Sequence, residues 1–277
     1  MPRPNLIYLK NFILVLLGGA FGFLVSFLGI GLTIIAVPIV AILLGFRFAK
    51  ASASAAAVTL FAAGASLPYY YMSHHINLMA VFAIILGQRV GALLASKIDG
   101  GFSLAIKFNI VVGTILALLG LAMVTAAGGY WNHIAAAFSG PWHTSHYSVA
   151  GLAAILIIGM FAGLLSRVFA VTGLLIVPSL ELIMWSSPLE AQGTALLVLA
   201  IDSLLMCIVW AKRDCIDRGA TQWMAGGAVF GGLTGAMCAN TLAHPVVLMS
   251  MYGAALVVLG SVKILQLGKS RIDISVP

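Results

Sequence analysis

Long apolar stretches, separated by short polar segments, make up almost the whole chain. A helix needs about twenty residues to cross a hydrocarbon core of roughly 30 Å, and most of the stretches approach that length. A membrane β-barrel is excluded, because its strands would be about ten residues long and would alternate in polarity. The sequence therefore predicts an all-α polytopic membrane protein. We expect ten apolar segments, five in each half of the chain: 11–29, 32–45, 51–72, 77–96, 102–126, 149–167, 173–185, 190–211, 221–239 and 244–265.

The composition excludes several other classes of protein. Of the 277 residues, 62% are hydrophobic and only 8% are charged, which is too few charges to cover the surface of a soluble domain. A soluble enzyme, a disordered chain and a nucleic-acid-binding protein are therefore excluded, and the expected partner is the lipid bilayer. The three cysteines, Cys207, Cys215 and Cys238, form no CxxC pair. They predict neither a disulfide framework nor a zinc ribbon.

Lysine and arginine lie in every second connection between the segments. Ten alternating crossings reproduce this division, and by the positive-inside rule both termini are cytoplasmic. The N-terminal apolar run lacks a clear signal-peptide cleavage site, so we interpret it as the first segment of a protein of the cytoplasmic (cell inner) membrane. The cation-free connections are 29–31, 73–77, 128–148, 186–188 and 240–243. The basic positions are Arg3, Lys10, Arg47, Lys50, Lys97, Lys107, Arg167, Lys212, Arg213, Arg218, Lys263, Lys269 and Arg271.

When the sequence is aligned with itself at one fixed offset, the first half of the chain matches the second half without gaps. Val37-Pro38 then falls on Val177-Pro178, and four glycines fall on four glycines: Gly87, Gly91, Gly113 and Gly120 on Gly227, Gly231, Gly253 and Gly260. Five is an odd number of segments, so the second copy would enter the membrane from the opposite side, as in the inverted repeats of many secondary transporters. We expect a first repeat at 1–126, an outer connection at 127–148, and a second repeat with a short cytoplasmic tail at 149–277.

Each half contains a glycine-marked interruption shortly before a proline. The first is Gly29-Ile30-Gly31-Leu32-Thr33 before Pro38, and the second is Ala170-Val171-Thr172-Gly173 before Pro178. Paired interruptions are typical of transporter binding sites, and the free N–H groups and positive dipole at a helix start suit an anion. Two tight turns at the membrane surface are the alternative interpretation. The predicted substrate-binding residues here are Gly29, Gly31, Thr33, Thr172 and Gly173.

The segment after each interruption opens with small polar side chains. Ser52 and Ser54 lie there in the first half, and Gln192 and Thr194 lie there in the second half. They offer neutral hydrogen bonds beside the interruptions and are therefore candidate substrate ligands. The alternative is a structural role, because Ser and Thr in membrane helices often bond the carbonyl oxygens of their own helix.

Three ionisable side chains lie inside the predicted segments: Arg89, Glu181 and Asp202. A charge at the bilayer centre costs about 2.5–3.5 kcal/mol, and such residues usually face an interior cavity or a partner. Arg89 is a candidate ligand for an anionic substrate, and Asp202 and Glu181 are candidates for carrying a coupling proton. The alternative is a structural pair between the arginine and a carboxylate.

The duplicated pattern resembles the TauE/SafE family of sulfite and organosulfonate exporters. The stretches that carry the resemblance are Gly22–Gly31 through Pro38, Gly163–Ser166 through Pro178, Ala51–Ser54 and Ala191–Thr194. The resemblance extends from about Leu16 to Leu265, and the duplication at a constant interval makes its short motifs specific. It implies a secondary transporter that moves sulfite, organosulfonates or related small organic anions across the cytoplasmic membrane by alternating access.

Two other functions compete with this interpretation. One is a passive anion channel, and the other is a membrane-embedded enzyme or maturation factor that uses the loop histidines His74, His75, His143 and His146. His143 and His146 are spaced as a metal pair on a helix, but the pattern supplies no third ligand. We therefore expect no metal, no cofactor and no enzymatic activity.

Overall fold

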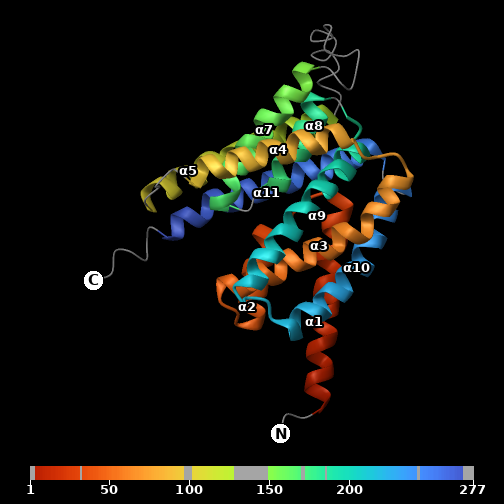
Figure 1. Cartoon of the computed structure of the whole chain (residues 1–277), viewed down its shortest axis with the longest axis vertical. Helices are drawn as coiled ribbons and strands as arrows, with labels where there is room; N and C mark the ends of the chain where they lie inside the picture. The colour runs from red at the N-terminus through yellow and green to blue at the C-terminus, as the bar shows by residue number, and fades with distance from the viewer. Residues whose placement is uncertain are drawn as a thin grey trace. The chain divides into compact units, whose positions relative to one another are not determined.

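The regular secondary structure in the described parts of the chain is entirely α-helical. The computed structural model describes residues 4–31, 33–96, 102–127, 149–169, 172–184, 186–241 and 244–270. These residues form ten α-helices and no strand (Figure 1), which confirms the all-α prediction, and each predicted segment falls on one helix. The helices are α1 (Pro4–Leu28), α2 (Thr33–Leu44), α3 (Phe48–Met72), α4 (Leu78–Ser96), α5 (Phe102–Ala127), α7 (Val149–Phe169), α8 (Thr172–Ile183), α9 (Pro188–Lys212), α10 (Arg218–Thr241) and α11 (Pro245–Ser270).

Four described helices are long and apolar enough to cross a membrane, and their candidate spans are Tyr8–Leu28, Phe48–Met72, Leu78–Ala95 and Pro188–Lys212. Large apolar side chains point outward from the helices, and Phe82 and Phe230 are 69% and 72% exposed. So much exposed apolar surface needs lipid to cover it, as expected of a multi-pass membrane protein. The two helices that follow the interruptions, α2 and α8, have only 12 residues each, too few to span comfortably.

The helices pack into two compact units, and each unit takes helices from both halves of the sequence. Unit 1 contains Met1–Phe82 and Leu189–Ala243, and unit 2 contains Ala83–Pro188 and His244–Pro277. Unit 1 therefore holds α1, α2, α3, α9 and α10, whereas unit 2 holds most of α4 together with α5, α7, α8 and α11. The boundaries 1–126, 127–148 and 149–277 concern the order of the sequence repeats and stay a prediction.

In unit 1, α1 and α10 lie side by side with their backbones in contact (Figure 1). A Cβ atom on Gly227 would overlap the carbonyl oxygen of Val15 and lie 2.9 Å from the amide nitrogen of Gly19. A Cβ atom on Gly231 would overlap the carbonyl oxygen of Gly19 and lie 2.8 Å from the amide nitrogen of Phe23. Contacting residue numbers rise together along both helices, so α1 and α10 run parallel. The glycines therefore provide a close-packed face, as small residues do in membrane helices.

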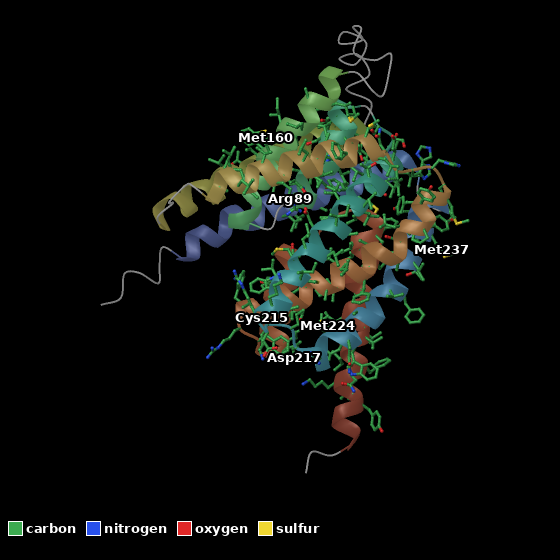
Figure 2. The ribbon with its side chains drawn as sticks, in the orientation of Figure 1. Arg89, Met160, Cys215, Asp217, Met224 and Met237 are labelled. Carbon is green, nitrogen blue, oxygen red and sulfur yellow. The ribbon has the colours of Figure 1, made fainter. Side chains whose placement is uncertain are left out.

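In unit 2, α4 and α7 repeat this contact at equivalent positions. A Cβ atom on Gly87 would overlap the carbonyl oxygen of Leu156 and lie 2.9 Å from the amide nitrogen of Met160. A Cβ atom on Gly91 would overlap the carbonyl oxygen of Met160, which Figure 2 labels, and lie 2.9 Å from the amide nitrogen of Leu164. These two glycines are the counterparts of the two α10 glycines in the sequence repeat. The two halves of the sequence thus form the same parallel helix pair twice.

The third glycine-lined pair, α5 and α11 of unit 2, runs antiparallel. A Cβ atom on Gly253 would lie 2.7 Å from the carbonyl oxygen of Gly120, and one on Gly260 would lie 2.6 Å from that of Gly113. The first and ninth helices (α1 and α10) are parallel, as are the fourth and sixth (α4 and α7), whereas the fifth and tenth (α5 and α11) are opposed. These are the directions that ten alternating crossings require.

The turns after α3 and α9 have the same backbone geometry. His74 and Asp214 lie at equivalent positions, and they are the two described non-glycine residues with positive φ, at 57° and 51°. In both turns the N–H of the next residue donates to the carbonyl oxygen five positions earlier, at 2.9 and 3.1 Å. Figure 2 labels Asp217 and Cys215 in the second turn. Positions that are equivalent in the sequence repeat therefore share the same backbone conformation in these two turns, in addition to the residue identities found elsewhere in the repeat.

The helices that follow these turns, α4 and α10, are capped in the same way. Oδ1 of Asn77 accepts a hydrogen bond from the N–H of Ala80 at 3.0 Å, and Oδ1 of Asp217 accepts one from the N–H of Ala220 at 2.9 Å. Each side chain satisfies one of the N–H groups that a helix start leaves unpaired. The turn and cap at 73–77 lie in a connection without cations, while their counterparts at 213–217 lie in a basic connection.

Candidate functional site

The first predicted interruption lies between α1 and α2 in unit 1, and we call Gly29–Gly31 the α1–α2 break. Gly29 follows the end of α1 with φ at +69°, a left-handed conformation that glycine adopts without strain. A Cβ atom on Gly29 would lie 3.0 Å from Cα of Gln192 and 3.1 Å from its Cβ and Cγ. One on Gly31 would lie 2.9 Å from Cδ2 of Leu199. The two glycines therefore let the break pack directly against α9.

Gln192 is fully buried beside the break, and only half of its amide is paired. The hydroxyl of Tyr70 donates toward the carbonyl oxygen of Ser26 at 3.0 Å and toward Oε1 of Gln192 at 3.3 Å. The Ser26 carbonyl belongs to the last turn of α1, where carbonyl oxygens lack helical donors. Nε2 of Gln192 has no hydrogen-bond partner among the described residues. Tyr70 therefore holds the side chain of Gln192 in place, while the N–H donors of Gln192 stay unused.

The unused N–H donors of Gln192 make the α1–α2 break a candidate binding site for a hydrogen-bond acceptor. A buried polar group without a partner costs about 1–3 kcal/mol, so such a group needs an explanation. The amide of Gln192 thus supplies neutral N–H donors beside the break, and such donors suit the oxygens of an anion.

The turn after α3 closes the same end of unit 1 over the start of α9. The backbone N–H of Asn77 donates to Oγ1 of Thr194 at 3.0 Å, and its Nδ2 donates to Oε1 of Glu190 at 3.3 Å. Nδ1 of His75 lies 2.9 Å from Oδ1 of Asn240, in the last turn of α10. The break, the turn after α3, the start of α9 and the end of α10 therefore meet at one end of unit 1. The charge pattern predicted that these four connections share one side of the membrane.

Two of the predicted substrate ligands have structural partners in unit 1. Thr194 accepts from Asn77, and Oγ of Ser54 lies 2.9 Å from Oγ1 of Thr221, which joins α3 to α10. Two other predicted substrate ligands, Thr33 and Ser52, are half-buried, and so is Asp202, which was predicted to carry a coupling proton. Thr33 and Asp202 each interact with a further residue. Their roles in binding or ion coupling stay predictions.

The second predicted interruption precedes α8 in unit 2. Ala170, Val171 and the side chain of Thr172 lie outside the described residues. Because Pro178 has no N–H, the carbonyl of Leu174 loses its helical donor. The fully buried Tyr252 of α11 replaces that donor: its hydroxyl lies 3.3 Å from the carbonyl oxygens of both Gly173 and Leu174. A tyrosine from a distant helix therefore supports each interruption.

Unit 2 also holds the remaining predicted ionisable residues. Glu181 of α8 is 6% exposed, and neither carboxyl oxygen has a hydrogen-bond partner among the described residues. Arg89 of α4, labelled in Figure 2, is exposed and interacts with another residue. The adjacent Gln88 is 3% exposed, and both its amide atoms are unpaired among the described residues. A substrate site that joins these residues to the α1–α2 break stays a prediction, because the predicted members belong to different units.

The loop histidines of the alternative functions do not assemble a metal site in the described part of the chain. His74 is exposed, His75 contacts Asn240, and His143 and His146 lie outside the described residues. No group of three or more His, Cys, Asp or Glu side chains in the described ranges has a metal-binding arrangement.

Tyr70 and Tyr252 were not among the residues predicted from the sequence. One signal for Tyr252 was present, since Pro178 must free a carbonyl group that some donor then satisfies. The identity of that donor was not readable, because Tyr252 is 78 positions from Leu174 along the chain.

Comparison with known proteins gives two matches. The sequence pattern of the family described as "Sulfite exporter TauE/SafE" matches residues 2–139 and 155–274. The chain is also 25% identical over 224 residues to a "Probable membrane transporter protein" of Xylella fastidiosa (strain 9a5c), and the alignment covers 78% of this chain and 80% of that protein. No solved structure matches the chain significantly.

Proposed function

Because the chain belongs to the TauE/SafE family of membrane transporters, we propose that it moves sulfite, organosulfonates or related small organic anions by alternating access. The resemblance drawn from the duplicated motifs is thereby confirmed at the level of the family. One observation carries the choice of an anion: the buried Nε2 of Gln192 is unpaired among the described residues, beside the α1–α2 break.

A sulfur oxyanion fits these donors chemically. Sulfite and sulfonates carry their negative charge on several oxygens, each of which accepts hydrogen bonds from N–H donors such as the amide of Gln192. Hydrogen bonds to a charged group contribute about 1.5–3 kcal/mol each. Glu190 is the carboxylate nearest in sequence to Gln192, and Nδ2 of Asn77 donates to it. That hydrogen bond offsets part of the negative charge of the Glu190 carboxylate beside the site.

The duplicated geometry supports alternating access. The same glycine contacts, positive-φ turns and helix caps recur in both halves of the sequence, once beside the cation-free connection 73–77 and once beside the basic connection 213–217. By the positive-inside rule, equivalent turns then face opposite sides of the cytoplasmic membrane, with both termini in the cytoplasm. Two copies in opposite orientation can exchange conformations, which opens a site to each side in turn.

The decisive experiment is uptake of radiolabelled sulfite into proteoliposomes that contain the full-length protein. We expect saturable uptake, inhibited by unlabelled sulfite and sulfonates. Gln192→Ala removes the unpaired donor, and the loss of one hydrogen bond to a charged ligand predicts an increase in KM of about 10- to 150-fold. Ser66→Ala is the matched control, because Ser66 is equally buried in unit 1 but donates only to Ala63 of its own helix.

Three results would contradict the proposal. Failure of the wild-type protein to transport any sulfur oxyanion would remove the substrate class. Equal KM values for Gln192→Ala and Ser66→Ala would remove the α1–α2 break from the binding site. Non-saturable flux, or single-channel currents in a planar bilayer, would identify a passive channel instead of a carrier.

A further inference from the structure

Glu181 lies in an apolar setting within unit 2. It belongs to the short helix α8, it is 6% exposed, and Oε1 and Oε2 both lack a hydrogen-bond partner among the described residues. The residues 173–180 that precede it on α8 are apolar except Ser179, whose hydroxyl donates to the carbonyl oxygen of Leu175 at 2.6 Å. An ionised carboxylate buried without a partner is too costly to persist. In this conformation the side chain is therefore the neutral acid.

Among the described side chains, few titratable groups lie on the helices that contact α8. The helix α8 packs against α7 and α5, and Tyr252 connects it to α11. Among the described side chains of α11 (246–261), Tyr252 is the titratable one, and its hydroxyl donates to carbonyl oxygens of α8. The described side chains of α5 (111–126) and α7 (151–164) include no Lys, Arg, His, Asp or Glu. Four cations of α5, α7 and α11 lie outside the described side chains: Lys107, Arg167, Lys263 and Lys269.

We propose that Glu181 is the proton-exchange site that couples this transporter to the proton gradient. The inference rests on the proposed transport function and adds the coupling ion and its residue. The exchange is a simple proton transfer: the O–H bond of the carboxylic acid breaks, the proton passes to water, and a carboxylate remains. Because that carboxylate has no partner among the described residues in the conformation seen here, it forms only in a conformation that admits water to α8. Proton release and the change of conformation are thus linked.

Asp202 was the other acid predicted to carry a proton, and its setting differs. Asp202 is half-buried and interacts with another residue, whereas Glu181 is buried and unpaired among the described residues. A buried ionisable residue inside a membrane protein is a functional candidate in its own right. The observations therefore favour Glu181.

The test compares Glu181→Gln with wild type in sulfite-loaded and sulfite-free proteoliposomes, with the membrane potential clamped at zero. We expect wild type to accumulate labelled sulfite above equilibrium when a pH gradient is imposed. Glu181→Gln mimics the neutral acid permanently, so it should lose this accumulation while still exchanging labelled for unlabelled sulfite at equal pH. Ser179→Ala, two residues away on the same helix, should keep both activities. Accumulation by Glu181→Gln at the wild-type level would overturn the proposal, as would accumulation by wild type under a sodium gradient alone.

A second measurement separates failure of this inference from failure of the transport proposal. Infrared difference spectra of the purified full-length protein, without substrate, should show a protonated carboxyl band near neutral pH that is absent from Glu181→Gln. Should the substituted protein not elute as a single folded species, Glu181→Leu provides the same comparison. An identical carboxyl band in wild type and variant would overturn the proposal even if sulfite is transported. If wild type shows the band, Glu181→Gln lacks it and no sulfite is transported, then the proton site at Glu181 is retained and sulfite is rejected as the substrate.

Discussion

Substituting alanine for glycine at the contact between α1 and α10 tests the packing most directly. Gly231→Ala places a methyl group against the backbone of α1, where it would overlap the carbonyl oxygen of Gly19 and lie 2.8 Å from the amide nitrogen of Phe23. Gly226→Ala, on the same helix, meets nothing within 4 Å. The two changes are chemically identical, and both replace glycine inside a helix. Any difference between them therefore reports the contact with α1.

The expected difference follows from two opposing effects. Alanine is favoured over glycine inside a helix by at most about 1 kcal/mol, and this gain applies to both variants. Adding a methyl group to a packed interior costs about 1–3 kcal/mol, and sometimes more. At Gly231 the obstacle is backbone, which cannot move aside by rotating a side chain, so α1 and α10 must separate. We expect a net loss of about 2 kcal/mol for Gly231→Ala, against a change between zero and about 1 kcal/mol of stabilisation for Gly226→Ala.

Thermal unfolding of the detergent-solubilised protein, followed by tryptophan fluorescence at a fixed scan rate, measures this difference. A loss of about 2 kcal/mol corresponds to a fall of roughly 4–8 °C in apparent Tm for a chain of this size. The duplicated geometry adds a second arm, because Gly91→Ala meets the backbone of α7 in the same way and should cost a similar amount. Equal Tm values for Gly231→Ala and Gly226→Ala would refute the close packing of α1 on α10. An unchanged apparent Tm for Gly91→Ala would refute the equivalence of the two helix pairs.

Two further predictions concern the duplicated turns. Asn77→Ala and Asp217→Ala each remove a helix cap, which costs about 1 kcal/mol. Asn77→Ala should lower the apparent Tm further, because it also removes the hydrogen bond from Nδ2 to Glu190, which contributes about 0.5–1.5 kcal/mol. Equal Tm shifts for the two variants would contradict a stabilising role of that hydrogen bond. In spheroplasts, a membrane-impermeant maleimide should label Ser73→Cys from outside in a chain whose native cysteines are replaced by serine. A chain that keeps only Cys215 should be labelled after the membrane is opened, and labelling of both from one side would contradict the inverted orientation.

Much of the fold was predictable because membrane length and backbone chemistry act locally. A run of apolar residues fixes where each helix lies, and glycine and proline fix where it stops, so the predicted segments 32–45 and 173–185 became the short helices α2 and α8. The interleaving of the halves was not predictable. Glycines four residues apart mark a close-packed face on a helix, but they do not say which other helix that face meets. Gly231 meets α1 rather than a neighbour in sequence.

The candidate site was predictable only in part, for a similar reason. Gln192 was identified because it follows an interruption and carries neutral donors, and its unpaired Nε2 keeps that interpretation. Ser54 and Thr194 were selected by the same reasoning, yet they bond to Thr221 and Asn77. Buried hydroxyl groups find whichever acceptor or donor the packing brings near, and those partners lie 167 and 117 positions away in sequence. Tyr70, which orients Gln192, was missed because its partner is 122 positions distant.

The unpaired amide of Gln192 also bears on how a ligand would drive the conformational change. A ligand shifts an equilibrium only by the difference in its affinity for the two conformations. In this conformation, Nε2 lacks a partner among the described residues, at a cost of about 1–3 kcal/mol, and an anion that accepts from Nε2 removes that cost. Any other conformation in which Gln192 finds a protein partner would bind the anion less tightly by a similar amount, about 5- to 150-fold. Since Thr194, half a turn further along α9, accepts a hydrogen bond from Asn77, a ligand at Gln192 acts on a helix that is already tied to the turn between α3 and α4.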